Sequence, residues 1–405
     1  MYIILICAVA FKPYDGVIYY NKYDEQEEKY LDLKELREKL DRIDKRIAEL
    51  YEERMEVCEE VADYKIQAGK KVYDKEREQE KIAAMRALMH NDLNRSGIAE
   101  LTGLMMSMSR KMQYQKIAKQ GAAGRLPFIE IDAIDKENSR VVFQGAEGAY
   151  SQEAMFQYFG RDVHHFAVDS WRDAMIAIEE GSADYAVLPI ENSTAGIVSE
   201  IYDLLAEYDN YIIGEQTIRI EHCLMVLPGT KEEEIRRVLS HPQSLLQSET
   251  FLEKHPNWQQ ISMKNNAFAV RKVREDNDKA QAAIAGASAA EAYGMEILHR
   301  GVNGLKDNAT RFIIVSNQRV FLKNASRISI CFEVRHEAGS LYHLMSNFIY
   351  NDLNMTRIES RPILDRNWEY RFFIDFEGNL GDGAVKSALR GLREEARNLR
   401  ILGNY

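Results

Sequence analysis

The sequence predicts a multidomain chain with an all-α domain first, an α/β domain second and an α+β domain last. Three patterns lead to this prediction. Apolar residues spaced by three and four run through residues 33–67, short apolar runs alternate with helical segments in residues 139–318, and apolar residues recur at every second position in residues 326–405. A chain of 405 residues is long enough for about two to four domains.

Composition and charge exclude several functional classes. The chain carries 53 Lys and Arg against 64 Asp and Glu, and it is 45% hydrophobic and 29% charged, as in ordinary globular proteins. The net charge of −11 argues against nucleic acid as the main ligand, because phosphate binding requires clustered cations. The common nucleotide-binding and zinc signatures are also missing from the sequence. An anionic substrate must therefore be bound by individually placed cations.

The cysteines and the N-terminal residues indicate where in the cell the protein is located. Cys7, Cys58, Cys223 and Cys331 lie far apart without a CxxC spacing, which argues against a disulfide framework or a zinc site. The apolar run over residues 1–11 could serve as a signal-peptide core, but it lacks a basic start and is too short to span a bilayer. We expect a cytoplasmic protein without membrane contact, and we leave residues 1–30 without a role.

The helical domain is expected over residues 31–120. Its first helix runs from Leu33 to Gln67, about 50 Å at 1.5 Å per residue, and ends at Gly69. A second helix begins at Asp74 as N-cap and reaches about Met89, and a third follows Ser96 and Gly97. A helix as long as the first cannot bury its apolar stripe alone, so a bundle or an intertwined homodimer is implied.

The remaining two domains follow a predicted linker over residues 121–138. Apolar runs at residues 141–143, 185–189, 211–214, 223–227 and 312–315 alternate with helical segments at residues 170–181 and 197–208. This alternation indicates an α/β domain with a largely parallel sheet, over residues 139–318. The period-two strands and intervening helices of residues 326–405 suggest a ferredoxin-like βαββαβ unit.

Arg54 is the first chemical signal, because it lies on an apolar stripe of Leu, Ile and Val. An unpaired guanidinium there would cost several kcal/mol, so Arg54 requires an anion. A salt bridge to a glutamate within the bundle would suffice. Other polar groups could instead converge with Arg54 into a site: Arg37, Lys65, Asp74, Arg77, Glu78, Ser109 and Gln113.

These residues resemble the all-helical chorismate mutases, with a match over LREKLDRIDKRIAELYEERMEV, the Lys65 position, DKEREQE and the Ser109/Gln113 pair. The resemblance implies a pericyclic rearrangement of chorismate to prephenate without acid, base or covalent step. It assigns the two substrate carboxylates to Arg37 and Arg54. Arg37 would reach into the partner subunit's site. Lys65 and Gln113 would contact the ether oxygen. Glu78 and Asp74 would orient the ring hydroxyl, and Ser109 and Arg77 would complete the carboxylate contacts.

Four motifs mark the α/β domain. VVFQGAEGAYSQEA reads as a strand, a loop with Gly145 and Gly148, and a helix from Ser151. PIENS places polar residues between a buried strand and a helix, a position typical of ligand sites, although helix capping by Ser193 or Thr194 explains it equally well. SHPQ at residues 240–243 and NATRF at residues 308–312 follow.

In this order the four motifs resemble the prephenate dehydratases. The resemblance implies two α/β lobes, as in periplasmic binding proteins, and conversion of prephenate to phenylpyruvate with loss of CO₂ and the ring hydroxyl. Thr310 would hydrogen-bond or protonate the departing hydroxyl. His222 is interpreted as a core histidine. The residues expected to bind or support the substrate are Glu191, Asn192, Ser193, Thr194, Ser240, His241, Gln243, Arg311 and Phe312, although a structural ion pair would also explain Arg311.

The C-terminal domain resembles the ACT regulatory domains that bind L-phenylalanine in these enzymes. The resemblance rests on EAGSL at residues 337–341 and on ESRP at residues 359–362, although Ser340 and Tyr342 depart from the usual pattern. A glycine turn and a surface ion pair would also explain these residues. The expected effector contacts are Gly339, Ser340, Leu341, Glu359, Ser360, Arg361 and Pro362.

Together the resemblances point to the bifunctional chorismate mutase/prephenate dehydratase family. They imply a homodimer or higher homo-oligomer, chorismate and prephenate as substrates, feedback regulation by L-phenylalanine, and no metal or cofactor. Two alternatives remain open. One is a two-lobed binding or sensor protein with a helical dimerisation domain, and the other is an enzyme that retains the dehydratase activity alone.

Overall fold

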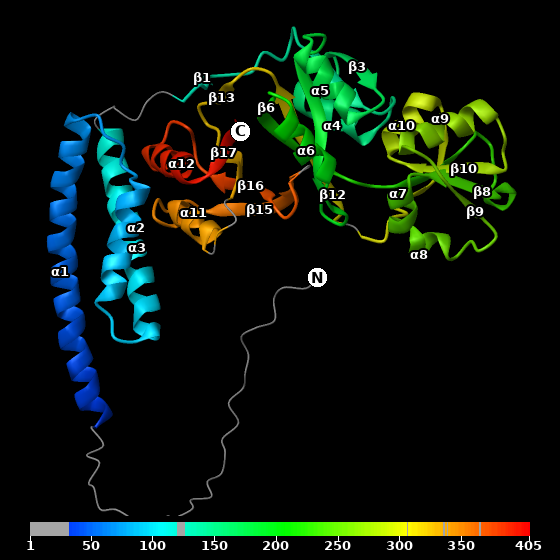
Figure 1. The fold of residues 1–405 in the computed structure, drawn as a ribbon. Helices are drawn as coiled ribbons and strands as arrows, with labels where there is room; N and C mark the ends of the chain where they lie inside the picture. Colours follow the sequence, from blue (N-terminus) through cyan, green and yellow to red (C-terminus); the bar gives the residue numbers. More distant parts are fainter. Residues whose placement is uncertain (1–31, 120–125, 306, 335–336, 338, 364–365) are drawn as a thin grey trace, which may run out of the picture. The chain divides into compact units, whose positions relative to one another are not determined.

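The computed structural model describes residues 32–405 except residues 120–125, 306, 335–336, 338 and 364–365. The chain divides into two units, residues 1–57 and residues 58–405 (Figure 1). The predicted extension over residues 1–30 lies outside the described residues. Across the part of the chain that is described, no helix is both long and apolar enough to cross a membrane.

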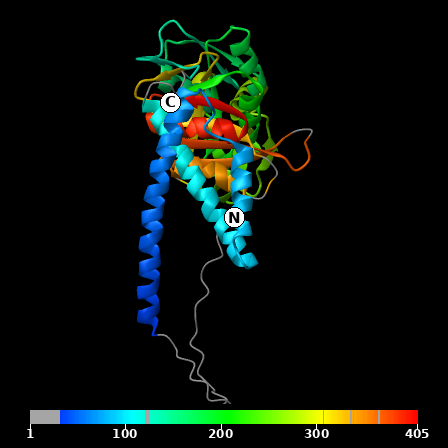
Figure 2. The same ribbon diagram turned by 60° about the vertical axis from the view of Figure 1, so that its left-hand side comes forward.

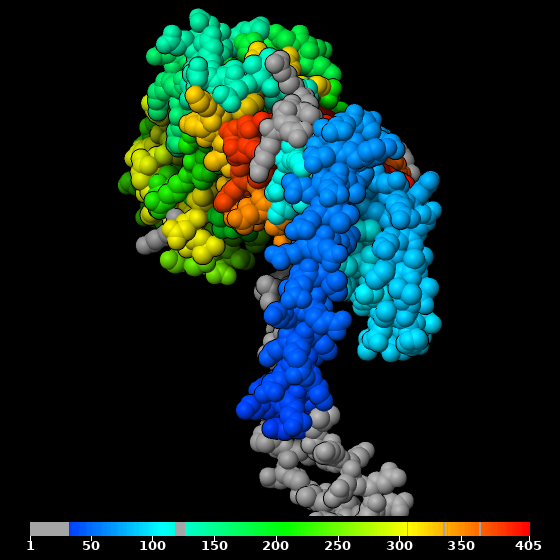
Figure 3. All heavy atoms as spheres, turned by 90° about the vertical axis from the view of Figure 1, so that its left-hand side faces the viewer, coloured from blue at the N-terminus to red at the C-terminus, as the bar shows by residue number. Residues whose placement is uncertain are grey.

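The first helix confirms the predicted range. Helix α1 spans Leu33–Gln67 and is drawn in blue in Figure 2. Gly69 ends it with a left-handed backbone at φ 62°. The apolar stripe stays exposed by 40% to 60% in the single chain, at Leu33, Leu36, Leu40, Ile43, Ile47, Leu50, Val57 and Val61. Figure 3 shows the surface of α1 in blue. A row of exposed apolar side chains along a helix indicates an interaction face.

For the other two helices, the structure corrects one predicted boundary. Helix α2 spans Lys75–Ala87, and its N-cap Asp74 accepts a hydrogen bond from the backbone of Arg77, as predicted. Helix α3 spans Asp92–Lys119, so the prediction that it begins after Ser96 and Gly97 was wrong. The Asn91 side chain accepts a hydrogen bond from the backbone N–H of Asn94 at 2.8 Å and caps the helix earlier.

The first α/β lobe is built on the strand order β6-β12-β4-β2-β3. Helices α4 (Tyr150–Phe159), α5 (Trp171–Glu179) and α6 (Ser199–Glu207) cover it. Its strands are β2 (Arg140–Gln144), β3 (His164–Val168), β4 (Tyr185–Asn192), β6 (Tyr211–Arg219) and β12 (Ala309–Ser316), with the short β5 (Gly196–Ile197) beside β4. Buried apolar clusters fill this lobe on both faces of the sheet.

The second lobe contains a five-stranded sheet in the order β11-β7-β10-β8-β9. The strands are β7 (Cys223–Val226), β8 (Arg237–Ser240), β9 (Gln259–Ser262), β10 (Gln281–Ala285) and β11 (Glu296–Arg300). The helices are α7 (Pro242–Gln247), α8 (Glu249–Leu252), α9 (Asn266–Asp276) and α10 (Ala287–Tyr293), with a 3₁₀ turn at Glu232–Glu234. The chain enters this lobe after β6 and leaves it before β12 (Figure 1).

The expectation of largely parallel sheets was wrong, because both sheets are mixed. Strands β2, β3 and β4 pair in parallel, as do β8, β9 and β10. The strands next to the crossings between lobes pair antiparallel instead: β12 with β4 and β6, and β7 with β10 and β11. These pairings join strands that lie far apart in the sequence, so the local alternation of strands and helices does not reveal them.

The C-terminal segment confirms the predicted βαββαβ order. It consists of β14 (Arg327–Glu333), α11 (Ser340–Ile349), β15 (Met355–Pro362), β16 (Tyr370–Glu377), α12 (Gly383–Glu395) and β17 (Arg397–Asn404). The strand order β15-β16-β14-β17 is antiparallel throughout and has its own apolar core. Strand β17 also meets β6 where Gly403 lies beside Ile212, and a Cβ at position 403 would collide with the Ile212 carbonyl.

The segment predicted as a linker contains a strand. Strand β1 (Ile129–Ile131) pairs in parallel with β13 (Val320–Leu322), which follows the first lobe. The sequence did not predict this strand, because three residues carry too little periodicity to indicate one and the partner lies about 190 positions further on. The pairing ties the start of the α/β region to its end.

Candidate active sites

A cleft of about 450 Å³ lies between the two α/β lobes. Its walls come from the loops that follow β2, β4 and β8 and from the two segments in which the chain passes between the lobes, after β6 and before β12. Ligand sites in α/β proteins occur at this position, outside the carboxyl ends of the strands. Five of the residues predicted for the dehydratase site line the cleft: Asn192, His241, Gln243, Thr310 and Phe312.

The glycine loop after β2 forms one wall. Gly145 and Gly148 adopt positive φ angles of 125° and 76°. A Cβ at position 148 would collide with the backbone of Ala289 on the second lobe, so only glycine permits this close approach. The Ser151 hydroxyl donates to the Gln144 carbonyl at 2.6 Å and closes the loop. The motif therefore brings the start of α4 to the cleft.

Asn192 and Thr310 form the central pair of the cleft. They face each other in the register of β4 and β12, and the Asn192 Nδ2 donates to the Thr310 Oγ1 at 2.9 Å. The amide orientation is determined, because the Asn192 Oδ1 accepts from the backbone N–H groups of Thr194 and Ala195, at 3.0 and 2.9 Å. Thr310 thus accepts through its oxygen, and its own proton is free to donate to a bound molecule.

A chain of hydrogen bonds extends from this pair to a histidine. The Asn308 Oδ1 accepts from Asn192, so its Nδ2 faces the Gln247 Oε1, at 3.1 Å. The Gln247 Nε2 then donates to the Thr194 Oγ1 at 2.6 Å. Because the Gln247 Oε1 is an acceptor, His222 carries its proton on Nε2, which lies 2.9 Å away.

His222 is only 1% exposed, which agrees with its interpretation as a core histidine, and it also lines the cleft. Its Nδ1 faces the Tyr150 hydroxyl at 2.8 Å. Burial lowers the pKa of His222 and outweighs the hydrogen bond to Gln247, so the ring is neutral at neutral pH. The sequence position beside a predicted strand was compatible with both roles, and only the crossing between the lobes places the ring in the cleft.

The buried neutral state of His222 predicts acid sensitivity. Since its folded pKa lies below the ordinary 6.5, the unfolded chain binds the proton first as the pH falls. The stabilising contribution is complete above pH about 6.5 and is lost as the pH falls through the folded pKa. We expect the denaturation midpoint of a His222→Gln variant to depend less on pH below 6.5 than that of the unmodified chain. The matched control is His164→Gln, because it removes a histidine that is exposed. Identical slopes in all three proteins would contradict the assignment.

The remaining motif residues have other partners. The Ser240 side chain is fully buried and its hydroxyl donates to the Ile284 carbonyl at 2.6 Å, so it supports the cleft wall. The Ser193 Oγ accepts from the Ala309 backbone at 3.0 Å. Burial lowers the pKa of His241, whose Nδ1 caps the Gln243 backbone at 3.2 Å. Thr194 contributes to the chain of hydrogen bonds described above.

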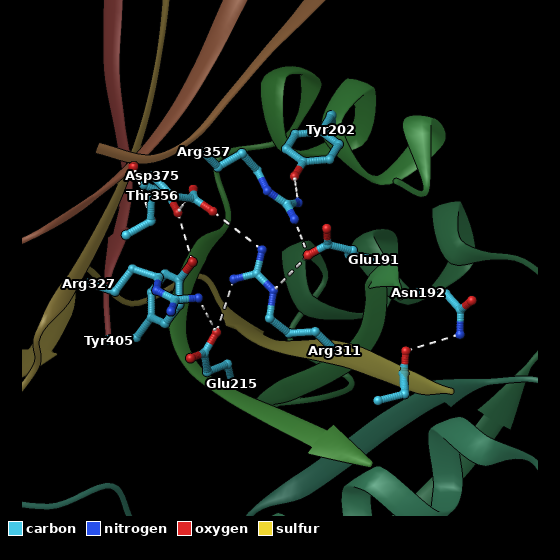
Figure 4. A network of polar contacts seen from close by, with 12 residues as sticks. Glu191, Asn192, Tyr202, Glu215, Arg311, Arg327, Thr356, Arg357, Asp375 and Tyr405 are labelled. Atoms are coloured by element: carbon cyan, nitrogen blue, oxygen red, sulfur yellow. Dashed lines mark hydrogen bonds and ion pairs between the residues drawn. The ribbon is translucent and has the colours of Figure 1, made fainter. Parts of the chain in front are cut away.

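Glu191 and Arg311 do not line the cleft. Neighbouring residues of a strand point to opposite faces, so these two point away from Asn192 and Thr310. The Arg311 guanidinium contacts Glu191, Glu215 and Asp375, at 3.6, 3.1 and 3.3 Å (Figure 4). Among the residues of the described chain that line the cleft, Lys264 is the only Lys or Arg. The structure therefore places Arg311 in an ion-pair network and Lys264, which sequence reasoning missed, at the cleft.

The predicted mutase residues of the second unit lie on the helices. The Lys65 ammonium donates to the Val72 carbonyl at 2.6 Å, and the Gln113 Nε2 donates to the Ser109 Oγ at 3.0 Å. Burial lowers the pKa of Lys65, although Asp74 and Glu78 oppose this shift. Ser109 and Gln113 are buried, and the Gln113 Oε1 has no hydrogen-bond partner among the described residues. A buried acceptor of this kind suits a polar ligand.

Arg110 was missed by sequence reasoning. It donates to both carboxylate oxygens of Glu78 at 2.5 Å and to Glu395 at 3.1 Å. Glu394 accepts from the Tyr114 hydroxyl and from the Tyr73 backbone N–H. Helix α12 of the C-terminal segment therefore contacts Arg110, which in turn binds the predicted mutase residue Glu78. No local motif signals this contact between distant parts of the sequence.

The other mutase residues are less enclosed. Asp74 caps α2, and the exposed Arg77 pairs with Glu80 at 3.4 Å. Arg37 is exposed and Arg54 is half-buried on α1, in the first unit. Their convergence with the residues of the second unit stays a prediction.

The expected effector residues lie on two elements of the C-terminal segment. Gly339 has a φ angle of 80° and directly precedes α11, whose first two residues are Ser340 and Leu341. Glu359, Ser360, Arg361 and Pro362 lie on β15. The Arg361 guanidinium binds both carboxylate oxygens of Asp203 on α6, at 3.1 and 2.6 Å. Within the described residues no three His, Cys, Asp or Glu side chains gather into a metal-binding group.

Fold and site together define a helical domain followed by a two-lobed α/β domain with an interlobe cleft. A family model for chorismate mutase type II matches residues 36–114, and one for prephenate dehydratase matches residues 141–320. The chain is 31% identical over 379 residues to the bifunctional chorismate mutase/prephenate dehydratase of Pseudomonas aeruginosa and 30% identical over 376 residues to that of Escherichia coli. These alignments cover 92% and 91% of this chain, and 97% and 95% of the relatives. The chain belongs to the bifunctional chorismate mutase/prephenate dehydratase family.

Two solved structures match about two thirds of this chain. A prephenate dehydratase of Arthrobacter aurescens in complex with L-Phe matches with a TM-score of 0.62 and 28% identity, covering 66% of this chain and 89% of that chain. GqqA, described as a novel type of quorum-quenching acylase, matches with a TM-score of 0.61 and 32% identity, covering 66% of this chain and 97% of that chain. Similar folds therefore carry two described activities, so the fold alone does not establish the activity.

Proposed function

We propose that this chain converts chorismate to prephenate and prephenate to phenylpyruvate, under feedback regulation by L-phenylalanine. The observation that carries the proposal is the presence of both family domains in one chain, where the product of the first reaction is the substrate of the second. The Asn192–Thr310 pair supports the second step, because both residues line the cleft and Thr310 accepts from Asn192, which leaves the threonine hydroxyl able to donate to a bound molecule.

The dehydratase reaction breaks two bonds of prephenate. The bond between the ring and its carboxylate breaks with release of CO₂, its electron pair completes the aromatic ring, and the bond to the ring hydroxyl breaks as that group leaves. Negative charge develops on the departing oxygen. A hydrogen bond from Thr310 stabilises this charge, and the bond from Asn192 holds the threonine in place beforehand.

The substrate's carboxylates require positive partners in the cleft. Lys264 supplies the one formal positive charge among the described lining residues. Helix α4 begins at the cleft, and its N-cap Ala149 offers no side-chain hydrogen bond, so the first N–H groups of the helix suit an anion. His241 and Gln243, at the start of α7, add further polar contacts.

For the mutase step, we propose an intertwined dimer in which a second copy of the chain covers the exposed stripe of α1. Eight apolar side chains exposed by at least 40% support this association. Arg37 would then reach the site of the partner subunit. The residues that would belong to the site of their own subunit are Arg54, Lys65, Asp74, Arg77, Glu78, Ser109 and Gln113. The dimer, the domain boundaries at residues 120, 138 and 318, and the cytoplasmic location stay proposals.

For regulation, we propose that the βαββαβ segment is an ACT domain that binds L-phenylalanine near Gly339 and the β15 motif. The contacts of α12 with Arg110 and of Arg361 with Asp203 link this segment to both catalytic regions. Such links suit an effector that regulates both reactions.

Binding of the effector to the folded chain should stabilise it. L-Phenylalanine at 100 times its Kd adds about 2.7 kcal/mol, which raises the unfolding temperature. Thermal unfolding with L-phenylalanine, and with D-phenylalanine as the control, measures the effect. A flat titration up to millimolar concentration would contradict the regulatory role.

The alternatives predict different results. A binding or sensor protein would bind prephenate without turnover, and a dehydratase that lacks the mutase would leave chorismate unchanged. An acylase like GqqA would cleave an amide and leave prephenate intact. The bifunctional proposal is favoured because the mutase and dehydratase models match separate parts of this chain.

A further inference from the structure

An ion-pair network joins the C-terminal segment to the two strands that carry Asn192 and Thr310 (Figure 4). On the C-terminal side, Arg357 on β15 contacts Glu191 on β4, and it also donates to the Tyr202 hydroxyl at 2.6 Å. From β12, the Arg311 guanidinium reaches Glu191 at 3.6 Å and Asp375 on β16 at 3.3 Å. Glu191 is therefore shared by one arginine from each side.

The network is partly enclosed and balanced in charge. The side chains of Arg311, Arg357 and Asp375 are only 12%, 15% and 7% exposed, whereas those of Glu191, Glu215 and Arg327 are 34%, 32% and 32% exposed. Glu215 completes it by accepting from Arg311 and Arg327, each at 3.1 Å, so three arginines face three carboxylates. Removal of one partner from such a cluster leaves a buried charge uncompensated, and the remaining groups must rearrange.

The peptide chain connects the network directly to the reacting groups. Glu191 precedes Asn192 on β4, and Arg311 follows Thr310 on β12. Glu191 and Arg311 point away from the cleft, while their neighbours Asn192 and Thr310 line it. A change in the position of Glu191 therefore changes the backbone that carries Asn192, whose Nδ2 holds the Thr310 hydroxyl at 2.9 Å.

We propose that Arg357 is a positioning residue for the dehydratase site and the link through which β15 acts on it. Arg357 lies two residues before Glu359, in the strand that carries the expected effector motif. Four residues further on, Arg361 binds Asp203, which follows Tyr202 on α6. Both arginines of β15 thus contact the lobe that carries Asn192. This inference rests on the proposed dehydratase activity and on its regulation by L-phenylalanine.

The test compares Arg357→Gln with Arg400→Gln in the full-length chain. Arg400 is a matched control, because it also joins the C-terminal segment to the first lobe, through Asp209 at 3.0 Å and the Ala206 and Tyr208 carbonyls. It has no contact with Glu191 or Arg311 among its described partners. The kcat and KM for prephenate, with and without L-phenylalanine, and the rate with chorismate are measured for each variant.

We expect Arg357→Gln to lower kcat by about threefold to thirtyfold while KM stays within about twofold. Inhibition by L-phenylalanine should weaken by a similar factor, although calorimetry still detects its binding. The mutase rate should stay unchanged and so report that the chain is folded. Arg357→Lys should recover part of both effects, since it keeps the positive charge but loses the planar fork.

Each other result has a defined meaning. Unchanged kcat and unchanged inhibition in Arg357→Gln would overturn the proposal, as would equal losses in Arg400→Gln, which would indicate general loosening of the C-terminal segment. If L-phenylalanine does not bind the unmodified chain, the regulatory part of the proposed function fails, and the change in kcat still decides whether Arg357 positions the site. Absence of prephenate turnover in the unmodified chain would reject the dehydratase activity itself.

Discussion

A Thr310→Val variant is expected to lose prephenate turnover by about 10²- to 10³-fold, because it removes the hydroxyl that stabilises the departing oxygen. Valine has the same shape as threonine. The Asn192 Nδ2 keeps two acceptors, the Asn308 Oδ1 at 2.8 Å and the Ala309 carbonyl at 3.1 Å, so the unfolding temperature should change little. Steady-state release of phenylpyruvate measures the loss.

The control for this variant is Thr310→Ser, which keeps the hydroxyl and should retain much of the activity. The conversion of chorismate by the valine variant should be unchanged, since the mutase residues lie on other elements. Retained formation of phenylpyruvate in Thr310→Val would remove Thr310 from its proposed role.

An Arg54→Ala variant is expected to lose chorismate turnover by about 10²- to 10³-fold while prephenate turnover is unchanged. The reason is the loss of the guanidinium that the mutase resemblance assigns to a substrate carboxylate, a contact that also holds the substrate in its reactive conformation. The rates are measured separately with chorismate and with prephenate.

Arg46→Ala serves as the matched control, because Arg46 lies on the same helix and is exposed. It should leave both rates near those of the unmodified chain. Equal loss of both activities in Arg54→Ala would contradict separate sites. It would indicate that α1 contributes to the folding of the whole chain.

Much of the fold could be predicted from local patterns. The long stripe from Leu33 predicted α1 to its last residue, and the period-two strands predicted the βαββαβ order. The start of α3 was misplaced, because Asn91 caps it and the sequence offers Ser96 as a second good capping residue. The antiparallel pairing of β12 and the strand β1 depend on partners far away in sequence, so periodicity alone cannot reveal them.

The candidate site was predictable where motifs and strand ends coincide. Asn192 and Thr310, both expected at the dehydratase site, lie side by side on β4 and β12. Arg311 shows the limit of this reasoning, because strand alternation turns the residue after Thr310 toward the C-terminal segment, whose position a motif does not encode. His222 and Arg110 likewise acquire their roles through contacts between distant segments.

The most direct test of the central claim supplies the purified full-length chain with chorismate and, separately, with prephenate, at neutral pH without added metal. Phenylpyruvate is followed by its absorbance in alkali. The account predicts phenylpyruvate from both substrates, with less of it when L-phenylalanine is present. Product from prephenate alone would contradict the mutase assignment, and no product from either substrate would contradict the account as a whole.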